Sequence, residues 1–72
     1  MKDTTIYTVT YDNEVLGVFT SYFQMREFIW KEFEKDFYDI ESDYEYTIID
    51  EQNCLNFIDE LGVWWQKFTI KI

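Results

Sequence analysis

Residues 21–37 read SYFQMREFIWKEFEKDF, and this stretch decides the fold. Ser21 and Gln24 have the spacing of a capping box, in which a serine hydroxyl accepts a hydrogen bond from a free backbone N–H group at the start of a helix. Apolar residues then recur at steps of three and four, and they are Met25, Phe28, Ile29, Phe33 and Phe37. This period predicts an amphipathic helix over about residues 21–36.

Two strands are predicted before the helix. From Thr4 to Tyr11 successive side chains would point to opposite sides of a strand, so the core-facing side would carry Tyr7, Val9 and Tyr11. Asp12-Asn13 tolerates the positive φ angles of a tight turn, and Val15 to Phe19 is the return strand. Gly17 within that strand indicates a bulge or a close approach by another element.

A third strand and a short helix are predicted next. Residues 44–49 alternate, with Tyr44, Tyr46 and Ile48 on the side expected to face the core. Asn53 is placed to cap a short helix from Cys54 to Leu61, and Gly62 is placed to end it.

The chain is expected to close with a strand from Val63 to Ile72, whose apolar side would carry Trp64, Phe68, Ile70 and Ile72. Residues 1–72 are therefore predicted to form one small α+β domain in the order β-β-α-β-α-β. In this domain the long helix packs across an antiparallel sheet.

The composition narrows the possible partners. The chain contains fifteen Asp and Glu residues and six Lys and Arg residues, so its net charge is −9. Direct binding to nucleic acid or to an anionic membrane is not expected, because those surfaces need clustered basic residues. Aromatic residues make up 22% of the chain, which favours a folded protein over an acidic disordered tail.

The expected location is the cytoplasm. The N-terminal stretch MKDTTIYTVTYD lacks the apolar run of a signal peptide, and the longest nearly apolar stretch, Val15 to Phe19, is far too short to span a membrane. Cys54 is the sole cysteine, which makes a reducing compartment the default.

An enzyme is not expected, and neither is a cofactor. The chain contains no histidine, so Cys54 has no imidazole to activate it, and two glycines cannot build a phosphate-binding loop. A carboxylate pair acting as acid and base, as in glycosidases, stays an alternative. A calcium loop starting at Asp39 would need Gly at its sixth position, where Tyr44 stands, so no metal site is predicted.

The acidic residues are concentrated in one segment. Between Glu32 and Glu51 there are nine carboxylates and one base, Lys35. If the alternation of acidic residues from Asp39 to Glu45 belongs to a strand entering the sheet, Glu41, Asp43 and Glu45 would face water about 6.6 Å apart, a spacing of the order of that between neighbouring phosphates. Glu32, Asp36 and Asp39 would extend this negative surface. One interpretation is a solvated face that keeps the protein soluble, and the other is a mimic of nucleic acid.

Two resemblances bear on origin and function. The opening, with residues 6–12, Glu14 and residues 17–21 leading into a helix, resembles the hairpin-then-helix start of many short phage and Firmicute proteins. The size and acidic composition are similar to those of the inhibitors by which phages disarm host nucleases, among them anti-CRISPR and anti-restriction proteins. This resemblance implies a protein that blocks the basic groove of a nucleic-acid-binding partner, such as a CRISPR effector or a restriction nuclease.

The aromatic residues support an alternative function. A chain of this size buries only about 60% of its unfolded surface, so some aromatic side chains should stay exposed, and we expect them to be Trp30, Trp65 and Tyr22. Trp and Tyr dominate interface hot spots. The alternative is therefore an aromatic-driven interaction or homo-oligomerisation module, with Trp30 and Trp65 as anchors.

Overall fold

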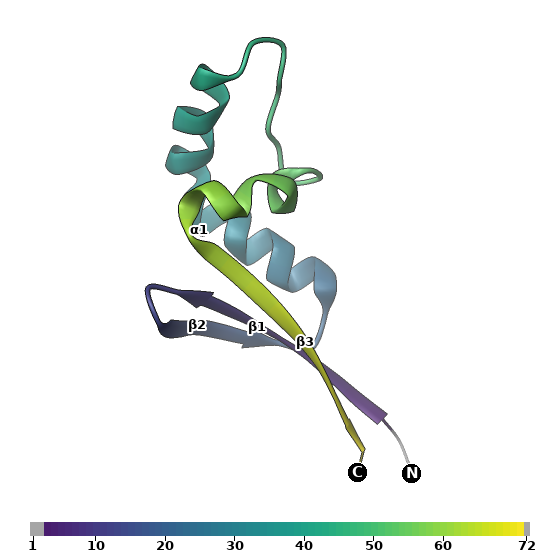
Figure 1. Cartoon of the computed structure of the whole chain (residues 1–72). Helices are drawn as coiled ribbons and strands as arrows, with labels where there is room; N and C mark the ends of the chain where they lie inside the picture. Colours follow the sequence, from purple (N-terminus) through teal and green to yellow (C-terminus); the bar gives the residue numbers. More distant parts are fainter. Residues whose placement is uncertain (1–2, 72) are drawn as a thin grey trace.

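The computed structural model describes residues 3–71. Figure 1 shows a twisted antiparallel sheet with the helical segments gathered on one of its sides. Along the chain the elements are β1 (Asp3–Tyr11), β2 (Glu14–Phe19), the long helix α1 (Tyr22–Asp43), the 3₁₀ helix η1 (Cys54–Leu61) and β3 (Val63–Lys71). The sheet has the order β2-β1-β3, and both of its contacts are antiparallel. The predicted α+β class is confirmed.

The opening hairpin forms as its turn residues predict. Asp12 and Asn13 both have positive φ angles, 53° and 66°, which match the twist of the two strands that they join. The register shifts between Val9 and Thr10, so that Val9 pairs with Gly17 and Thr10 pairs with Val15. This shift is the predicted bulge, and it lies directly beside Gly17.

Helix α1 begins at the predicted cap and runs further than predicted. The backbone N–H of Gln24 donates to Ser21 Oγ at 3.4 Å. The helix ends at Asp43 and bends at Phe33, whose φ and ψ are −116° and 18°. Its first half contacts β1 and β2, and its second half rises away from the sheet toward η1 (Figure 1). One side is buried along its whole length, and it carries Met25, Ile29, Phe33, Phe37 and Ile40.

The predicted third strand is wrong. Residues 44–50 form an irregular connection in which Tyr46 has a φ of 68°. None of the described strands pairs with the connection, and side chains bond part of its backbone instead: Glu41 accepts from the N–H of Ile49, and Asn53 accepts from the N–H of Asp50. The left-handed residue breaks the alternation, so Ile49 is buried whereas Ile48 is 74% exposed.

Asn53 does not cap η1. Its amide closes the connection, because Nδ2 donates to the carbonyl oxygen of Ile48 at 2.7 Å and Oδ1 accepts from the N–H of Asp50 at 2.8 Å. The end of η1 does follow the prediction. Gly62 takes a left-handed conformation with a φ of 74°, and its N–H donates to the carbonyl oxygen of Asp59.

The side of β3 that faces the core is not the predicted one. Val63 is buried and Trp65 is half-buried, whereas Trp64, Phe68 and Ile70 are exposed. The pairing of β3 with β1 gives the reason, since Trp65 lies opposite the buried Val9. Ile72, which belonged to the predicted apolar side, lies outside the described residues.

The core lies between the sheet and the helical layer. Its buried residues are Val9, Met25, Ile29, Phe33, Phe37, Ile40, Ile49, Cys54, Ile58 and Val63. Among residues 3–71, no helix is both long enough and apolar enough to cross a membrane.

Candidate partner-binding surface

The acidic residues chosen from the sequence lie on helix α1 and just after it. Glu32, Asp36, Asp39, Glu41 and Asp43 are all within α1, and Glu45 is in the turn that follows. The expectation that the last three stand on a strand is wrong. In a helix the carboxylates that share a side are three or four residues apart and not two.

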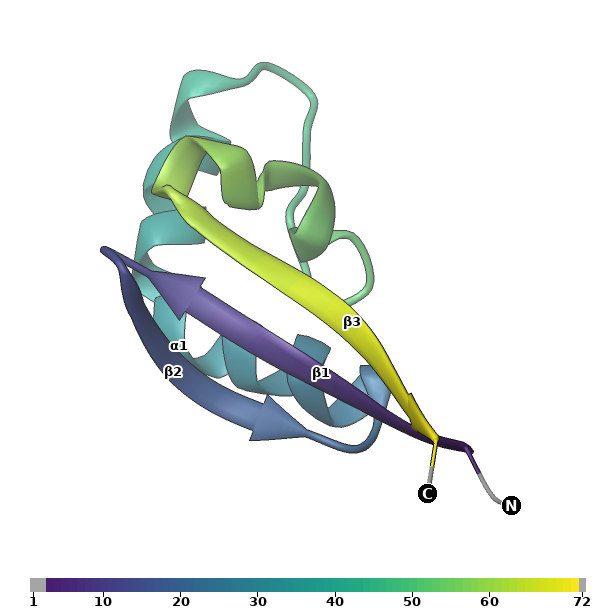
Figure 2. The same cartoon turned by 60° about the horizontal axis from the view of Figure 1, so that its bottom comes forward.

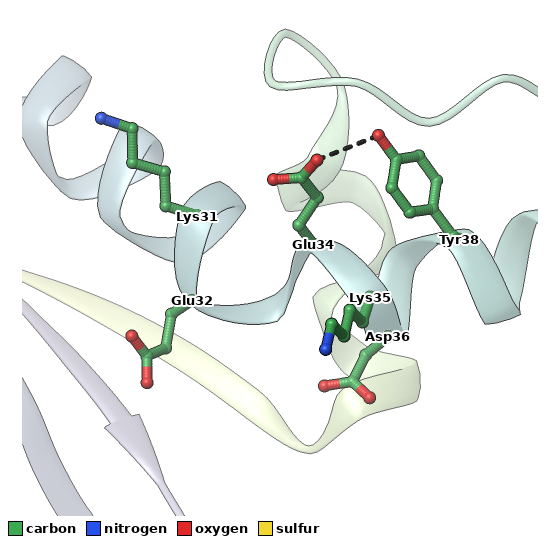
Figure 3. A pocket seen from close by; sticks show the side chains of 6 residues that line it. All are labelled: Lys31, Glu32, Glu34, Lys35, Asp36 and Tyr38. Atoms are coloured by element: carbon green, nitrogen blue, oxygen red, sulfur yellow. Dashed lines mark hydrogen bonds between the residues drawn. The ribbon is translucent and has the colours of Figure 1, made fainter.

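Four of these carboxylates form a line along one side of α1, which we name the acidic stripe: Glu32, Asp36, Asp39 and Asp43. Their steps of four, three and four residues keep them on one side of a helix. All four residues are exposed. Figure 3 shows the side chains of Glu32 and Asp36 pointing to the same side of α1, although the bend at Phe33 lies between them.

The stripe is not neutralised within the described chain. Among residues 3–71 the structure contains one ion pair, between Lys31 Nζ and Glu27 Oε1 at 2.7 Å. This pair lowers the pKa of Glu27 and raises that of Lys31, and both effects arise mainly from the hydrogen bond between them. No stripe carboxylate takes part in it, so all four are available to a cationic partner.

Glu41 has a different role from its neighbours. Its Oε2 atom accepts from the backbone N–H of Ile49 at 2.8 Å, in a partly buried position. Glu45 is exposed in the turn after α1. Two predicted binding residues therefore lie outside the stripe: Glu45, and Glu41, which makes a structural contact instead.

An open hollow of about 650 Å³ lies on the solvent side of α1 at the bend (Figure 3). Its lining residues are Lys31, Glu32, Glu34, Lys35, Asp36 and Tyr38. The hydroxyl of Tyr38 donates to Glu34 Oε1 at 3.0 Å, and this bond raises the pKa of Tyr38. Small-molecule sites are mostly apolar and enclosed, whereas this hollow is charged and open. The two lysines partly offset the stripe here, so its negative charge is strongest toward Asp39 and Asp43.

The two tryptophans proposed as anchors are less exposed than expected. Trp65 is half-buried between Tyr7 and Tyr22, with ring centroids 6.1 and 5.8 Å away. Trp30 is half-buried as well and stacks on Phe37 at 5.5 Å. Tyr22, the third aromatic expected to be exposed, is half-buried beside Trp65.

Cys54 is a buried thiol in the helical layer. The side chain is fully buried, and burial raises the pKa of its thiol to about 11, which keeps the sulfur protonated and unreactive at neutral pH. Within residues 3–71, no group of three or more His, Cys, Asp or Glu side chains is placed to hold a metal ion. In the calcium loop considered above, positions 1, 3 and 5 would be Asp39, Glu41 and Asp43, and these residues lie on a helix, where alternate residues point to different sides.

Sequence reasoning missed one surface. Trp64 is 56% exposed on the side of the sheet away from α1, together with Val15, Val18, Phe68 and Ile70. The signal is the alternation of residues 64–70, which marks this side as apolar but does not show that it faces away from the helices.

Comparisons with protein-family models, with curated proteins and with solved structures give no match to this chain.

Proposed function

We propose that this chain is an inhibitor that binds a nucleic-acid-binding protein and occupies its cationic groove with the acidic stripe. One observation carries the proposal. Four exposed carboxylates lie in line along α1, and no Lys or Arg of residues 3–71 pairs with them. Net charge segregated in this way produces a directional field, which steers association with an oppositely charged partner.

The spacing of the stripe is comparable with that of a nucleic-acid backbone. From Glu32 to Asp43 the helix rises about 16 Å, at ~1.5 Å per residue, so neighbouring carboxylates are about 5 Å apart along the axis. A single strand of DNA has one phosphate per ~3.4 Å of axis. The stripe therefore has roughly two thirds of the axial charge density of one strand.

The binding energy would come from several contacts acting together. An exposed ion pair contributes only about 0–1 kcal/mol. Carboxylates gain more where an arginine fork meets them, because the two parallel hydrogen bonds are charge-assisted. A groove that holds a nucleic-acid backbone offers several such side chains in a row, which fits a row of carboxylates better than an isolated one.

The connection after α1 adds apolar contact at the end of the stripe. Tyr46 is 95% exposed, and Ile48 is exposed nearby. Tyrosine is enriched among residues that dominate binding energies, so this loop is a suitable anchor beside Asp43. The part of Trp30 and Trp65 in binding stays a prediction.

The resemblance of this small acidic chain to phage-encoded inhibitors names the class of target. We place the partner among host defence nucleases, with a CRISPR effector or a restriction nuclease as the leading candidates. The compartment would be the cytoplasm of the host cell, and the lone, unbridged Cys54 fits a reducing environment.

The test uses two variants with equal charge. The triple substitution Asp36→Asn, Asp39→Asn and Asp43→Asn removes three charges from the stripe. The matched control, Asp3→Asn, Asp12→Asn and Glu14→Gln, removes three charges from the hairpin, whose turn residue Asp12 has a positive φ that asparagine also accepts. Each immobilised protein is used to capture nucleic-acid-binding proteins from a lysate of a low-GC bacterium, at low and at high salt.

We expect the wild type and the hairpin control to capture the same target at low salt, and the stripe variant to lose it. The purified target should then release its DNA or RNA when the inhibitor is added. If the target keeps its nucleic acid with unchanged affinity while it is bound to this chain, occlusion by mimicry is wrong. Capture that withstands both high salt and the stripe substitutions would favour the aromatic-driven module instead.

A further inference from the structure

The side of the sheet that faces away from α1 and η1 carries no charged residue. The strand registers define this surface, which we name the outer face. Its residues are Thr4, Ile6, Thr8 and Thr10 of β1, Val15 and Val18 of β2, and Trp64, Gln66, Phe68 and Ile70 of β3. The large apolar members Val15, Val18, Trp64, Phe68 and Ile70 are between 43% and 62% exposed.

The charged residues of the three strands are all on the other side. Asp3, Glu14, Lys67 and Lys71 share the side of Tyr7 and Val9, which faces the helical layer. In a sheet with one wet side, apolar residues alternate with polar ones and mark the side that is buried. By that rule the pattern assigns the outer face to burial.

The projecting end of the sheet shows the same pattern most clearly. Residues 3–6 of β1 pair with 68–71 of β3 beyond the last residue of β2, so this end is a ribbon of two strands. Its apolar residues Ile6, Phe68 and Ile70 point to the outer side, and the charged Asp3 and Lys71 point to the other. In Figure 2 the sheet is in front: the first half of α1 lies behind the strands, and η1 and the rest of α1 extend beyond the edge at β3. No described part of the chain covers this face.

We propose that the outer face binds a second copy of this chain, so that two sheets pack face to face around a two-fold axis. An apolar face with no charges matches itself, which is the condition for a symmetric interface. Electrostatics favours the same arrangement. With a net charge of −9 per chain, copies that met through α1 would bring their acidic stripes together, whereas packing through the outer faces leaves the stripes on opposite sides of the dimer.

The size of the face is at the lower limit of what a specific pair needs. The nine-residue strands β1 and β3 are about 30 Å long and the six-residue β2 is about 20 Å long, so at ~4.8 Å per strand the footprint is roughly 400 Å² per copy. Because side chains make the surface rough, a pair would remove about 1,000 Å² or more of accessible surface from water, which reaches the lower limit of specific interfaces. Two such sheets would pack about 10 Å apart, with their side chains interdigitated.

The polar residues of the face are compatible with this packing. Gln66 lies opposite Thr8 near the middle of the β1–β3 pair. Its amide both donates and accepts hydrogen bonds, so close to a two-fold axis it can pair with the threonines or with the Gln66 of the second copy. The inference does not depend on the acidic stripe, and a dimer of this kind would present two stripes on opposite surfaces.

Sedimentation equilibrium of the whole chain, from low to high micromolar concentration, tests the proposal. Val18→Lys and Gln66→Lys each place a charge on the outer face at an exposed position, where the fold of the monomer tolerates it. Ile48→Lys is the matched control, because it changes the net charge equally on an exposed residue that lies outside the sheet, in the connection between α1 and η1. Circular dichroism and thermal unfolding establish that each variant is folded.

We expect the wild type and Ile48→Lys to reach the mass of two chains within this range. Both outer-face variants should raise the dissociation constant at least tenfold. A wild type that stays monomeric throughout would overturn the proposal, including the case in which its outer face binds a different protein. A dimer that withstands both outer-face charges, or that Ile48→Lys weakens as strongly, would overturn it as well.

Discussion

The carboxylate of Glu41 and the backbone N–H of Ile49 are joined by a hydrogen bond of 2.8 Å. This bond fastens the last turn of α1 to the connection that leads to η1, and it does so beside the buried side chain of Ile49. A strand would satisfy the same N–H group through a neighbouring strand. Here one side chain replaces that pairing.

The Glu41 contact predicts a loss of stability on truncation. Glu41→Ala removes the acceptor of a partly buried N–H group, and we expect the free energy of unfolding to fall by about 1–3 kcal/mol. Glu41→Gln keeps a side-chain oxygen in place and should cost less. Urea denaturation measures both. Asp39→Ala, on the same helix but exposed, is the control and should change stability by about 0.5 kcal/mol or less. If Glu41→Ala were as stable as this control, the hydrogen bond between Glu41 and Ile49 would not contribute to the free energy of unfolding.

Substitution of Gly17 by any residue with a side chain is predicted to destabilise the fold. A Cβ atom there would lie 2.7 Å from Cζ of Phe19, whose ring packs against Phe28 with centroids 5.1 Å apart. The ring must move to admit a methyl group, so Gly17→Ala should lower the free energy of unfolding by about 1–3 kcal/mol. The double variant with Phe19→Leu frees that space. Equal effects of Gly17→Ala in the two backgrounds would contradict this explanation.

Gly62 is expected to matter for its backbone alone. Its φ is 74°, and a Cβ atom would meet nothing within 4 Å. Gly62→Ala should therefore cost about 1–2 kcal/mol of stability from the left-handed conformation itself. Gly62→Asn should cost less, because asparagine adopts this conformation more readily. Thermal unfolding of the two variants gives the comparison, and the prediction fails if asparagine proves the more harmful substitution.

Cys54 should react very slowly with thiol reagents in the native protein. Burial raises its pKa from 9.0 to about 11, so at pH 8 roughly one thiol in a thousand is ionised. We expect labelling at pH 8 to be at least a hundredfold slower in buffer than in concentrated urea.

The raised pKa of Cys54 also makes the stability of the fold depend on pH. The folded state holds this proton more tightly than the unfolded state, so the contribution is fully present below pH 9 and is lost as the pH rises toward 11. Cys54→Val should show a smaller loss of stability over that interval.

The parts of the fold that follow from local signals could be predicted from the sequence. The cap at Ser21, the period of α1, the turn at Asp12-Asn13 and the stop at Gly62 each depend on a few neighbouring residues. The third strand could not be excluded, because residues 44–49 alternate as a strand does. In the structure, the left-handed conformation of Tyr46 interrupts the extended backbone, and the carboxylate of Glu41, eight residues away in the sequence, takes the N–H of Ile49 that a neighbouring strand would bind.

The binding surface was predictable in composition but not in arrangement. On a strand, Glu41, Asp43 and Glu45 would share a side, whereas on α1 the steps of three and four select Glu32, Asp36, Asp39 and Asp43. The orientation of β3 was equally hidden. Residues 63–65 are apolar on both sides of the strand, and beyond them the more apolar side is the one with Phe68 and Ile70, although the helical layer covers the other.

Salt should act in opposite directions on the two proposed surfaces. Binding of a cationic groove by the acidic stripe depends on exposed charges, so raising the salt from about 50 to about 200 mM should weaken it several-fold or more. Packing of two outer faces depends on apolar burial, which ions do not screen, while salt does screen the repulsion between two chains of charge −9. The dimer should therefore hold or tighten over the same interval. Sedimentation equilibrium and binding to the captured target, at the same two salt concentrations, measure both effects. If the dimer dissociates as salt rises, charged groups hold it together, and the outer face is not its interface.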